Sequence, residues 1–232
     1  MAVEGVFRDS RQGIVRKTFP RPRTETIEAF RRTYSAFVLD HFGKEGAMDP
    51  AIAPLGPGQF VCGPAVTALG PDLTVRRMAI DTARPGDILV VAAGGLHNRA
   101  CFGDGTSLKM MKLGLSGAVI DGATRDRDGI LKLGFPVFCR GATPRNRHYP
   151  EEGLHGGVNV PVVCGGVLVK PGDMIIADGD GVVCVDREAA DAIVPTLLSN
   201  LDAEQAERAG IDDFTGFDVE PEMLKRGYTI LP

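Results

Sequence analysis

The chain has 232 residues, of which 44% are hydrophobic and 24% charged, the composition of an ordinary globular protein. Thirty acidic residues against 26 basic ones give a net charge of −4, which argues against nucleic acid and anionic membranes as partners. No apolar run approaches the roughly 18 residues of a membrane-spanning helix. The first residues have no apolar signal core, so we expect a cytoplasmic protein.

The N-terminal part begins with a polar, Arg-rich arm over residues 1–23. Apolar residues then recur at helical spacing, which predicts one helix over 25–42 with Thr24 as its N-cap. After residue 58 the pattern changes to short apolar runs separated by glycine, which are typical of strands. The predicted strands are 60–68, 75–80, 87–93, 117–121, 136–140, 161–169, 173–178 and 182–186.

Three further segments indicate helices: 105–114, 127–133 and 187–208. Pro195 lies inside the last of them and predicts a kink or a break. Strands and helices alternate in the middle of the chain, so neighbouring strands there are expected to be parallel, as in an α/β fold.

Two short stretches resemble each other, RPGDILV (84–90) and KPGDMII (170–176). Proline followed by glycine suits the central positions of a type II turn, so each stretch is predicted to be a turn that leads into a buried strand. Two similar turns explain the likeness, and a duplicated β unit stays open as the alternative.

The chain has five cysteines, an odd number, and no two of them form a Cys-x-x-Cys pair. We interpret them as reduced, buried residues that act as small hydrophobes. Cys101, in a glycine-rich stretch four residues after His97, is the alternative: a nucleophile with a neighbouring base. The four histidines show no spacing typical of a zinc site.

Charged residues follow two of the predicted parallel strands. Asp104 comes after strand 87–93, and Arg125 and Asp126 come after strand 117–121. Since ligands bind at the carboxyl ends of such strands, we expect these side chains to converge. Carboxylates suit Mg²⁺, and the planar cation of arginine suits a carboxylate or a developing enolate oxygen. The set therefore suits a small 2-oxo acid, although each motif alone is also typical of a turn or a solvated charge.

Twenty residues separate Asp104 from Arg125. This Asp-x20-Arg-Asp arrangement resembles that of the class II pyruvate aldolases acting on 4-hydroxy-4-methyl-2-oxoglutarate and 4-carboxy-4-hydroxy-2-oxoadipate. That family shares its fold with the regulator of ribonuclease E activity A. Blocks such as RPGDILVVAAGG (84–95) and GAVIDGATRDRDGILKLGFPVF (117–138) extend the resemblance over most of residues 50–186.

The resemblance implies a single three-layer β/β/α domain like the phosphohistidine swivelling domain, assembled as homotrimers or homohexamers. It divides the chain into an arm and helix over 1–46, a catalytic domain over 47–186, and a helix and tail over 187–232 that serve subunit packing.

The resemblance also implies a divalent metal, Mg²⁺ or Mn²⁺, held directly by Asp126 and through water by Asp104. Arg125 would contact pyruvate and stabilise its enolate. The pyruvate carboxylate would be bound at the start of the following helix, by backbone amides near Gly103, Gly105 and Thr106.

An acidic residue from a neighbouring subunit's C-terminal helix belongs to the family's site. Glu204 is the candidate here, and Glu207 is its rival. The chain departs from the family in the polar helix start Gly105-Thr106-Ser107. It also departs in residues 142–157, where Arg145, Arg147, His148 and His155 either widen the substrate site or form a solvated loop.

The implied activity is cleavage of a 4-hydroxy-2-oxo acid to pyruvate and a second 2-oxo acid, with oxaloacetate decarboxylation as a related reaction. No Schiff-base lysine is needed, and Lys109 and Lys112 are interpreted as surface charges. The alternative is a non-catalytic regulator that binds a ribonuclease. A third hypothesis, a methyltransferase, lacks the Gly-x-Gly-x-x-Gly loop of dinucleotide-type sites.

Overall fold

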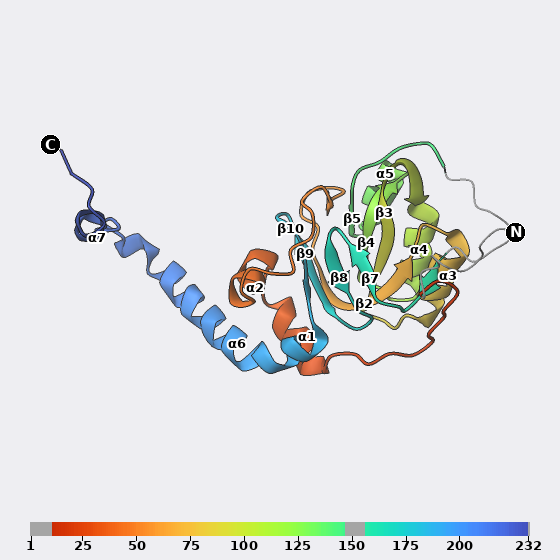
Figure 1. Ribbon diagram of the computed structural model, residues 1–232, viewed down its shortest axis with the longest axis horizontal. Coiled ribbons are helices and arrows are strands. Elements are labelled where there is room, and N and C mark those ends of the chain that lie inside the picture. Colours follow the sequence, from red (N-terminus) through yellow and green to blue (C-terminus); the bar gives the residue numbers. More distant parts are fainter. Residues whose placement is uncertain (1–10, 147–155, 232) are drawn as a thin grey trace, which may run out of the picture. The chain divides into compact units, whose positions relative to one another are not determined.

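The computed structural model describes residues 11–146 and 156–231. Its contacts divide the chain into two compact units, one ending at Leu197 and the other beginning at Leu198 (Figure 1). The first unit contains every strand and the first five helices. In the described part of the chain, no helix has the length and apolar character needed to cross a membrane.

Helices and strands alternate in the first unit. The helices of the chain are α1 (Thr24–Arg31), α2 (Ser35–His41), α3 (Leu73–Thr82), α4 (Asp104–Lys112), α5 (Arg127–Leu133), α6 (Arg187–Ala209) and α7 (Glu220–Lys225), with a 3-10 turn at Ile211–Asp213. The strands are β1 (Ala53–Pro54), β2 (Val61–Leu69), β3 (Ile88–Phe102), β4 (Gly117–Thr124), β5 (Val137–Cys139), β6 (Gly157–Val158), β7 (Val162–Cys164), β8 (Val167–Val169), β9 (Met174–Asp178) and β10 (Gly181–Val185).

The main sheet has the strand order β1-β5-β4-β3-β2-β9-β10, and β6 also pairs with β2. Strands β3, β4 and β5 are parallel neighbours, as predicted. Strand β2 is also parallel to β3, a pairing that the sequence analysis did not predict. Strand β2 joins two parts of the sheet, because residues 65–69 pair with β3 while residues 61–64 pair antiparallel with β9. The chain is therefore a mixed α/β protein, which confirms the predicted fold class.

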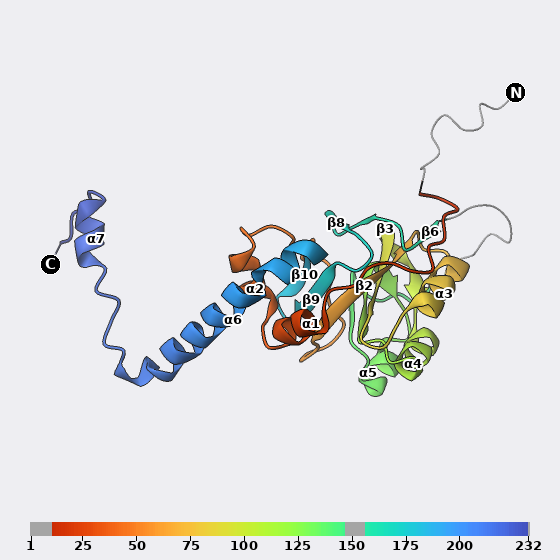
Figure 2. The same ribbon diagram turned by 90° about the horizontal axis from the view of Figure 1, so that it is seen from below.

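The parallel strands are buried on both faces, so the unit has three layers (Figures 1 and 2). Side chains alternate along β3: Leu89 and Val91 pack toward α3, α4 and α5, while Val90 and Ala92 pack toward β7, β9 and β10. Burial on both faces explains why these strands appear in the sequence as continuous apolar runs.

The predicted helix 25–42 is wrong in its continuity, because the chain forms α1 and α2 with a break between them. Thr33 Oγ1 donates to the Phe30 carbonyl at 2.7 Å, and Tyr34 is extended. Asp178 then accepts from the backbone N–H and the hydroxyl of Ser35, at 2.7 and 2.6 Å. A carboxylate 143 residues away therefore caps α2. Thr24 is the first residue of α1, and Arg23 occupies the N-cap position.

The predicted strand 75–80 is also wrong, because this segment belongs to α3. Asp72 Oδ1 accepts from the N–H groups of Thr74 and Val75, at 2.8 and 3.1 Å. A capped start of this kind favours a helix over a strand. Residues 161–169 likewise form two strands, since Gly165 and Gly166 adopt positive φ and turn β7 into β8.

Two further segments differ from the sequence-based prediction. Strand β3 continues past residue 93 to Phe102, through three register shifts against β4, where a loop was predicted. Helix α6 runs through Pro195 as one helix.

Both predicted Pro-Gly turns are present. Gly86 and Gly172 have φ of 91° and 89°, and the backbone N–H groups of Asp87 and Asp173 donate to Arg84 and Lys170. The positive φ at each glycine is what a type II turn requires.

The five cysteines are free and buried, as predicted. Burial raises the pKa of Cys62 and of Cys164 to about 12, so these thiols stay protonated at neutral pH. Burial also raises the pKa of Cys139 and Cys184.

Candidate functional site

The parallel register of β3 and β4 brings the predicted loops together. Phe102 and Thr124 are paired across the two strands. The Phe102 carbonyl accepts from the Arg125 N–H and from the Thr124 hydroxyl, both at 2.9 Å. Asp104 and Asp126 each lie two residues beyond this pair, so they leave the sheet at the same edge. The 20 residues between Asp104 and Arg125 thus contain helix α4 and strand β4, which return the chain to the same edge of the sheet.

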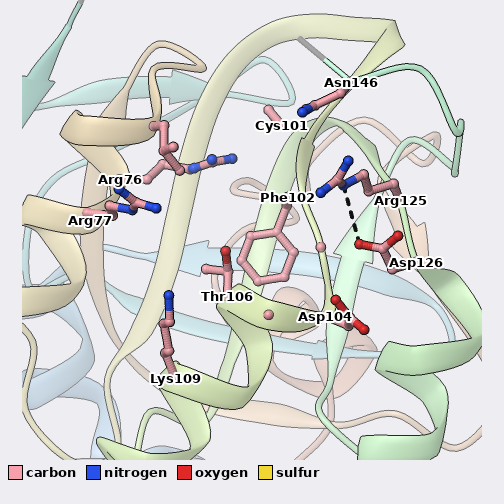
Figure 3. Close-up of a pocket in the computed structure, with 13 residues that line it drawn as sticks. Arg76, Arg77, Cys101, Phe102, Asp104, Thr106, Lys109, Arg125, Asp126 and Asn146 are labelled. Atoms are coloured by element: carbon pink, nitrogen blue, oxygen red, sulfur yellow. Dashed lines mark ion pairs between the residues drawn. The ribbon is translucent and has the colours of Figure 1, made fainter. Parts of the chain in front are cut away.

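A cavity of about 240 Å³ lies at this edge, between α3, α4 and the start of α5 (Figure 3). It contains six of the predicted residues: Gly103, Asp104, Gly105, Thr106, Arg125 and Asp126. The structure adds Leu73, Arg76, Arg77, Cys101, Phe102, Lys109 and Asn146.

Asp126 has an unusual backbone conformation. It precedes α5 with φ 58° and ψ 38°, in the left-handed region that aspartate tolerates better than most residues. Its side chain makes no capping hydrogen bond to the helix. Instead, its Oδ2 lies 3.3 Å from Arg125 Nε, with both side chains partly exposed at the cavity.

Two glycines make room for the carboxylates. A Cβ atom on Gly103 would lie 2.6 Å from Asp126 Oδ2, and one on Gly129 would lie 2.8 Å from Asp104 Oδ2. A Cβ atom essentially never lies this close to another heavy atom, so a side chain at either position would displace an acidic group. Glycine at 103 and 129 is thus a local requirement of this arrangement.

Helix α4 begins at Asp104, and its first turn lines the cavity through Gly105 and Thr106. The N–H groups of a first turn have no acceptor within the ideal helix, so they favour an anion. The Thr106 N–H donates to the Gly103 carbonyl at 3.1 Å. This amide is one of the groups predicted to donate to the substrate carboxylate, and it already has an acceptor within the turn.

The donors at this edge fit a magnesium-type ion. Within residues 11–146 and 156–231, no group of three or more His, Cys, Asp or Glu side chains is arranged to hold a metal. The cavity instead has two carboxylates, Asp104 and Asp126, and an open side. Mg²⁺ commonly binds through one or two carboxylates and keeps several waters, so the pair is compatible with it.

The sequence interpretation missed the cationic side of the cavity. Arg76 and Arg77 come from α3, which was predicted to be a strand, and Lys109 was interpreted only as a surface charge. The signal that could have located α3 is Gly70-Pro71-Asp72, a turn followed by a residue that favours the N-cap.

Other candidates lie elsewhere. Glu204 and Glu207 belong to the second unit, where Glu204 pairs with Arg208 at 2.5 Å. Arg145 is exposed and its carbonyl accepts from the Ala100 N–H at 2.8 Å. Three of the predicted residues lie outside the described part of the chain: Arg147, His148 and His155.

The alternative nucleophile is nearly inaccessible. Cys101 is 1% exposed, and its thiol lies 3.6 Å from the Ala123 carbonyl. His97 is exposed, and its Nδ1 lies 3.2 Å from the Gly95 carbonyl. A nucleophile–base pair would need the two side chains to be joined by a hydrogen bond, whereas these contacts direct each to the backbone.

The fold and the site define a mixed α/β protein with a charged cavity at the carboxyl edge of its parallel strands. Within this class, the chain belongs to the RraA-like family, whose model, described as Aldolase/RraA, matches residues 35–184. This confirms the family that the sequence motifs suggested.

Named relatives differ in the activity they are assigned. A protein of Halalkalibacterium halodurans, "Putative 4-hydroxy-4-methyl-2-oxoglutarate aldolase", is 34% identical over 81% of this chain and 89% of its own. Streptomyces coelicolor RraAS2, described as an unusual member of the RNase ES inhibitor RraA family, has a TM-score of 0.70 and 32% identity, over 82% of this chain and 99% of that one. A Geobacillus kaustophilus protein described as a 2-dimethylmenaquinone methyltransferase has a TM-score of 0.59 and 29% identity, over 66% and 95%.

Proposed function

We propose that this protein is a divalent-metal-dependent lyase that cleaves a 4-hydroxy-2-oxo acid to pyruvate and a second 2-oxo acid. The observation that carries this proposal is the convergence of Asp104, Arg125 and Asp126 on one cavity from two separate strand ends. The aldolase name of the relative from Halalkalibacterium halodurans supports the same reaction class.

The two carboxylates have different roles in this proposal. Asp126 would hold Mg²⁺ or Mn²⁺ directly, and Asp104 would hold it through water. When bound, the ion polarises the 2-oxo group of the substrate and lowers the free energy of negative charge that develops on it. Asp104 also accepts, through a water molecule, the proton that leaves the 4-hydroxyl group.

Arg125 binds the oxygen on which charge develops. As the C3–C4 bond breaks, C4 becomes the carbonyl carbon of the second product and the bonding electrons form the enolate of pyruvate. Protonation of C3 then completes pyruvate. The backbone of Arg125 is held before the reaction by its N–H bond to the Phe102 carbonyl, and its guanidinium contacts Asp126. Such preorganised charge stabilises a transition state without further rearrangement. Oxaloacetate decarboxylation needs the same enolate, so we expect it as well.

The test is release of pyruvate from 4-hydroxy-4-methyl-2-oxoglutarate, 4-carboxy-4-hydroxy-2-oxoadipate and oxaloacetate, with added Mg²⁺ or Mn²⁺. We expect activity that a chelator removes and that either ion restores. Full activity in chelator would contradict the metal mechanism, and no pyruvate from any of the three acids would contradict the lyase.

The second candidate function is regulation of a ribonuclease by direct binding, and the structural likeness to Streptomyces coelicolor RraAS2 favours it. A pull-down with a purified ribonuclease of the E type tests it. Tight binding together with no lyase activity would favour the regulator. The likeness to the Geobacillus kaustophilus protein motivates one more control, calorimetry with S-adenosylmethionine, in which we expect no binding.

We also propose a homotrimer or homohexamer in which Glu204 of one subunit completes the site of the next. Light scattering determines the assembly. Glu204→Gln should lower kcat without changing the molar mass of the assembly. If only Glu207→Gln had this effect, the role would belong to Glu207.

A further inference from the structure

The N-terminal arm is bound along the first unit before α1 begins, and the proposed reaction gives it no role. We call its residues 13–21 the strap. The Arg16 N–H donates to the Val158 carbonyl at 3.1 Å, and the Val158 N–H donates to the Ile14 carbonyl at 2.8 Å. The strap thus adds a short parallel pairing to β6, which in turn pairs with β2. Figures 1 and 2 show this part of the chain in dark red, running from the side of α3 to the start of α1.

The end of the strap lies against both Pro-Gly turns. Arg21 binds Asp87 of the first turn through two hydrogen bonds, from Nε to Oδ1 at 3.0 Å and from Nη2 to Oδ2 at 2.6 Å. Asp87 is 1% exposed, so water screens this ion pair little. In the second turn, a Cβ atom on Gly172 would overlap the Pro20 carbonyl oxygen, so the backbone of the strap touches that turn. The two similar turns therefore hold two successive residues of the strap.

The middle of the strap is joined to α3 by two separate contacts. Asn159 is fully buried, and its Nδ2 donates to the Arg16 carbonyl at 2.7 Å and to Thr82 Oγ1, in the last turn of α3, at 2.8 Å. Phe19 of the strap packs against the core cluster that contains Ile80 of α3. A buried amide that donates to both elements, together with an apolar contact, ties the strap to the C-terminal half of this helix.

Helix α3 also reaches the cavity, because its first half lines it through Leu73, Arg76 and Arg77. The strap holds the other half of the same helix. Rigid elements and continuous hydrogen-bond networks are the parts of a protein that carry coupling between separate places. The strap and the cavity are therefore two places connected through one helix.

We propose that the strap is a positioning element for the cavity. Its docking on β6 and the two turns, and the binding of a ligand beside α3, favour one another, with α3 as the link. Coupling of this kind is reciprocal, so each event stabilises the other. The strap touches no reacting group, and the choice of a 2-oxo acid as the ligand rests on the proposed function.

The test is hydrogen exchange of the full chain, measured by mass spectrometry over residues 73–82. Arg16→Pro removes the N–H that donates to Val158. The amides of α3 should then exchange about fivefold faster, the factor that one backbone hydrogen bond contributes. Val15→Pro is the matched control, because Val15 lies between the two bonded residues and alternate residues of a strand direct their N–H groups to opposite sides. Both positions are exposed, and the control should leave α3 within about twofold of wild type.

Two further measurements separate coupling from a general loss of stability. The amides of α5, in the same unit, should exchange at the wild-type rate in Arg16→Pro. In the wild-type chain, saturating pyruvate with Mg²⁺ should slow the exchange of both α3 and the strap. Unchanged exchange of α3 in Arg16→Pro, an equal effect of Val15→Pro, or equal acceleration of α5 would overturn the proposal. Slower exchange of α3 with pyruvate but an unchanged strap would overturn it as well.

Kinetics distinguish the failure of this proposal from the failure of the lyase. Faster exchange of α3 alone in Arg16→Pro, in a protein that releases no pyruvate from any of the three acids, would support the strap and reject the lyase. If both proposals hold, Arg16→Pro combined with Phe19→Ala should raise KM for oxaloacetate about fivefold while kcat stays within about twofold. Pyruvate release with an unchanged KM in this double variant would support the lyase and reject the strap.

Discussion

The two walls of the cavity are built by different means. The acidic wall, Asp104 with Arg125 and Asp126, follows directly from two strand ends whose register is set by backbone hydrogen bonds. Arg76 and Arg77 of α3 and Lys109 of α4, which we call the basic wall, line the same cavity with long side chains. Backbone register fixes where the two strand ends lie relative to each other, as a reaction requires, whereas long side chains adapt to ligands of different shape. We therefore expect bond cleavage to depend on the acidic wall more than on the basic wall.

The largest expected effect is at the acidic wall. Asp126→Asn should lower kcat/KM for pyruvate release on the order of 10³-fold, because it removes the negative charge of the proposed direct metal ligand. Asparagine tolerates the left-handed backbone of this position, so the fold should be kept. Asp126→Ala should lose the same activity and also lower the melting temperature, which calorimetry measures. Activity within a few fold of wild type in Asp126→Asn would contradict this role.

Arg125→Lys should have the next largest effect, a loss of about 10²-fold in kcat. Lysine keeps the charge but loses the planar fork and the contact of Nε with Asp126. Steady-state kinetics with oxaloacetate should show the loss mainly in kcat. A loss confined to KM would instead place Arg125 with the basic wall and remove the distinction between the two.

Gly129→Ala tests the acidic wall without touching a charged group. Its Cβ would displace the Asp104 carboxylate, so the affinity for Mg²⁺ should fall about 10-fold, as it does when groups that orient metal ligands are removed. Gly179→Ala is the matched control, because a Cβ there meets nothing within 4 Å. Metal titration of activity measures both variants, and equal affinities would show that the Asp104 position is not constrained.

The smallest expected effect concerns the support of the basic wall. Asp72→Ala removes the cap of α3 and should lower the free energy of unfolding by about 1 kcal/mol. Because α3 carries Arg76 and Arg77 at the edge of the cavity, KM for oxaloacetate should rise while kcat changes little. Denaturant unfolding and steady-state kinetics with oxaloacetate measure the two effects, and a large loss of kcat would show that the two walls are coupled.

The acidic wall was predictable because its signal is local. Asp104, Arg125 and Asp126 stand where predicted strands end, and regular strand–helix–strand spacing brings such ends to one edge. The composition and the apolar runs likewise indicated the α/β class and five buried, reduced cysteines.

Tertiary structure decided the features that depend on distant partners. Asp178 caps α2 and thereby helps to split a helix whose apolar spacing looked continuous. The pairing of β3 with β4 extends a strand through Gly94 and Gly95, where local propensity favours a loop. The basic wall exists only because α3 is a helix that lies beside α4 at the cavity. The order of residues thus determined the strand ends and the groups that follow them, while packing between helices decided which other charges they meet, because apolar spacing alone does not report contacts between distant elements.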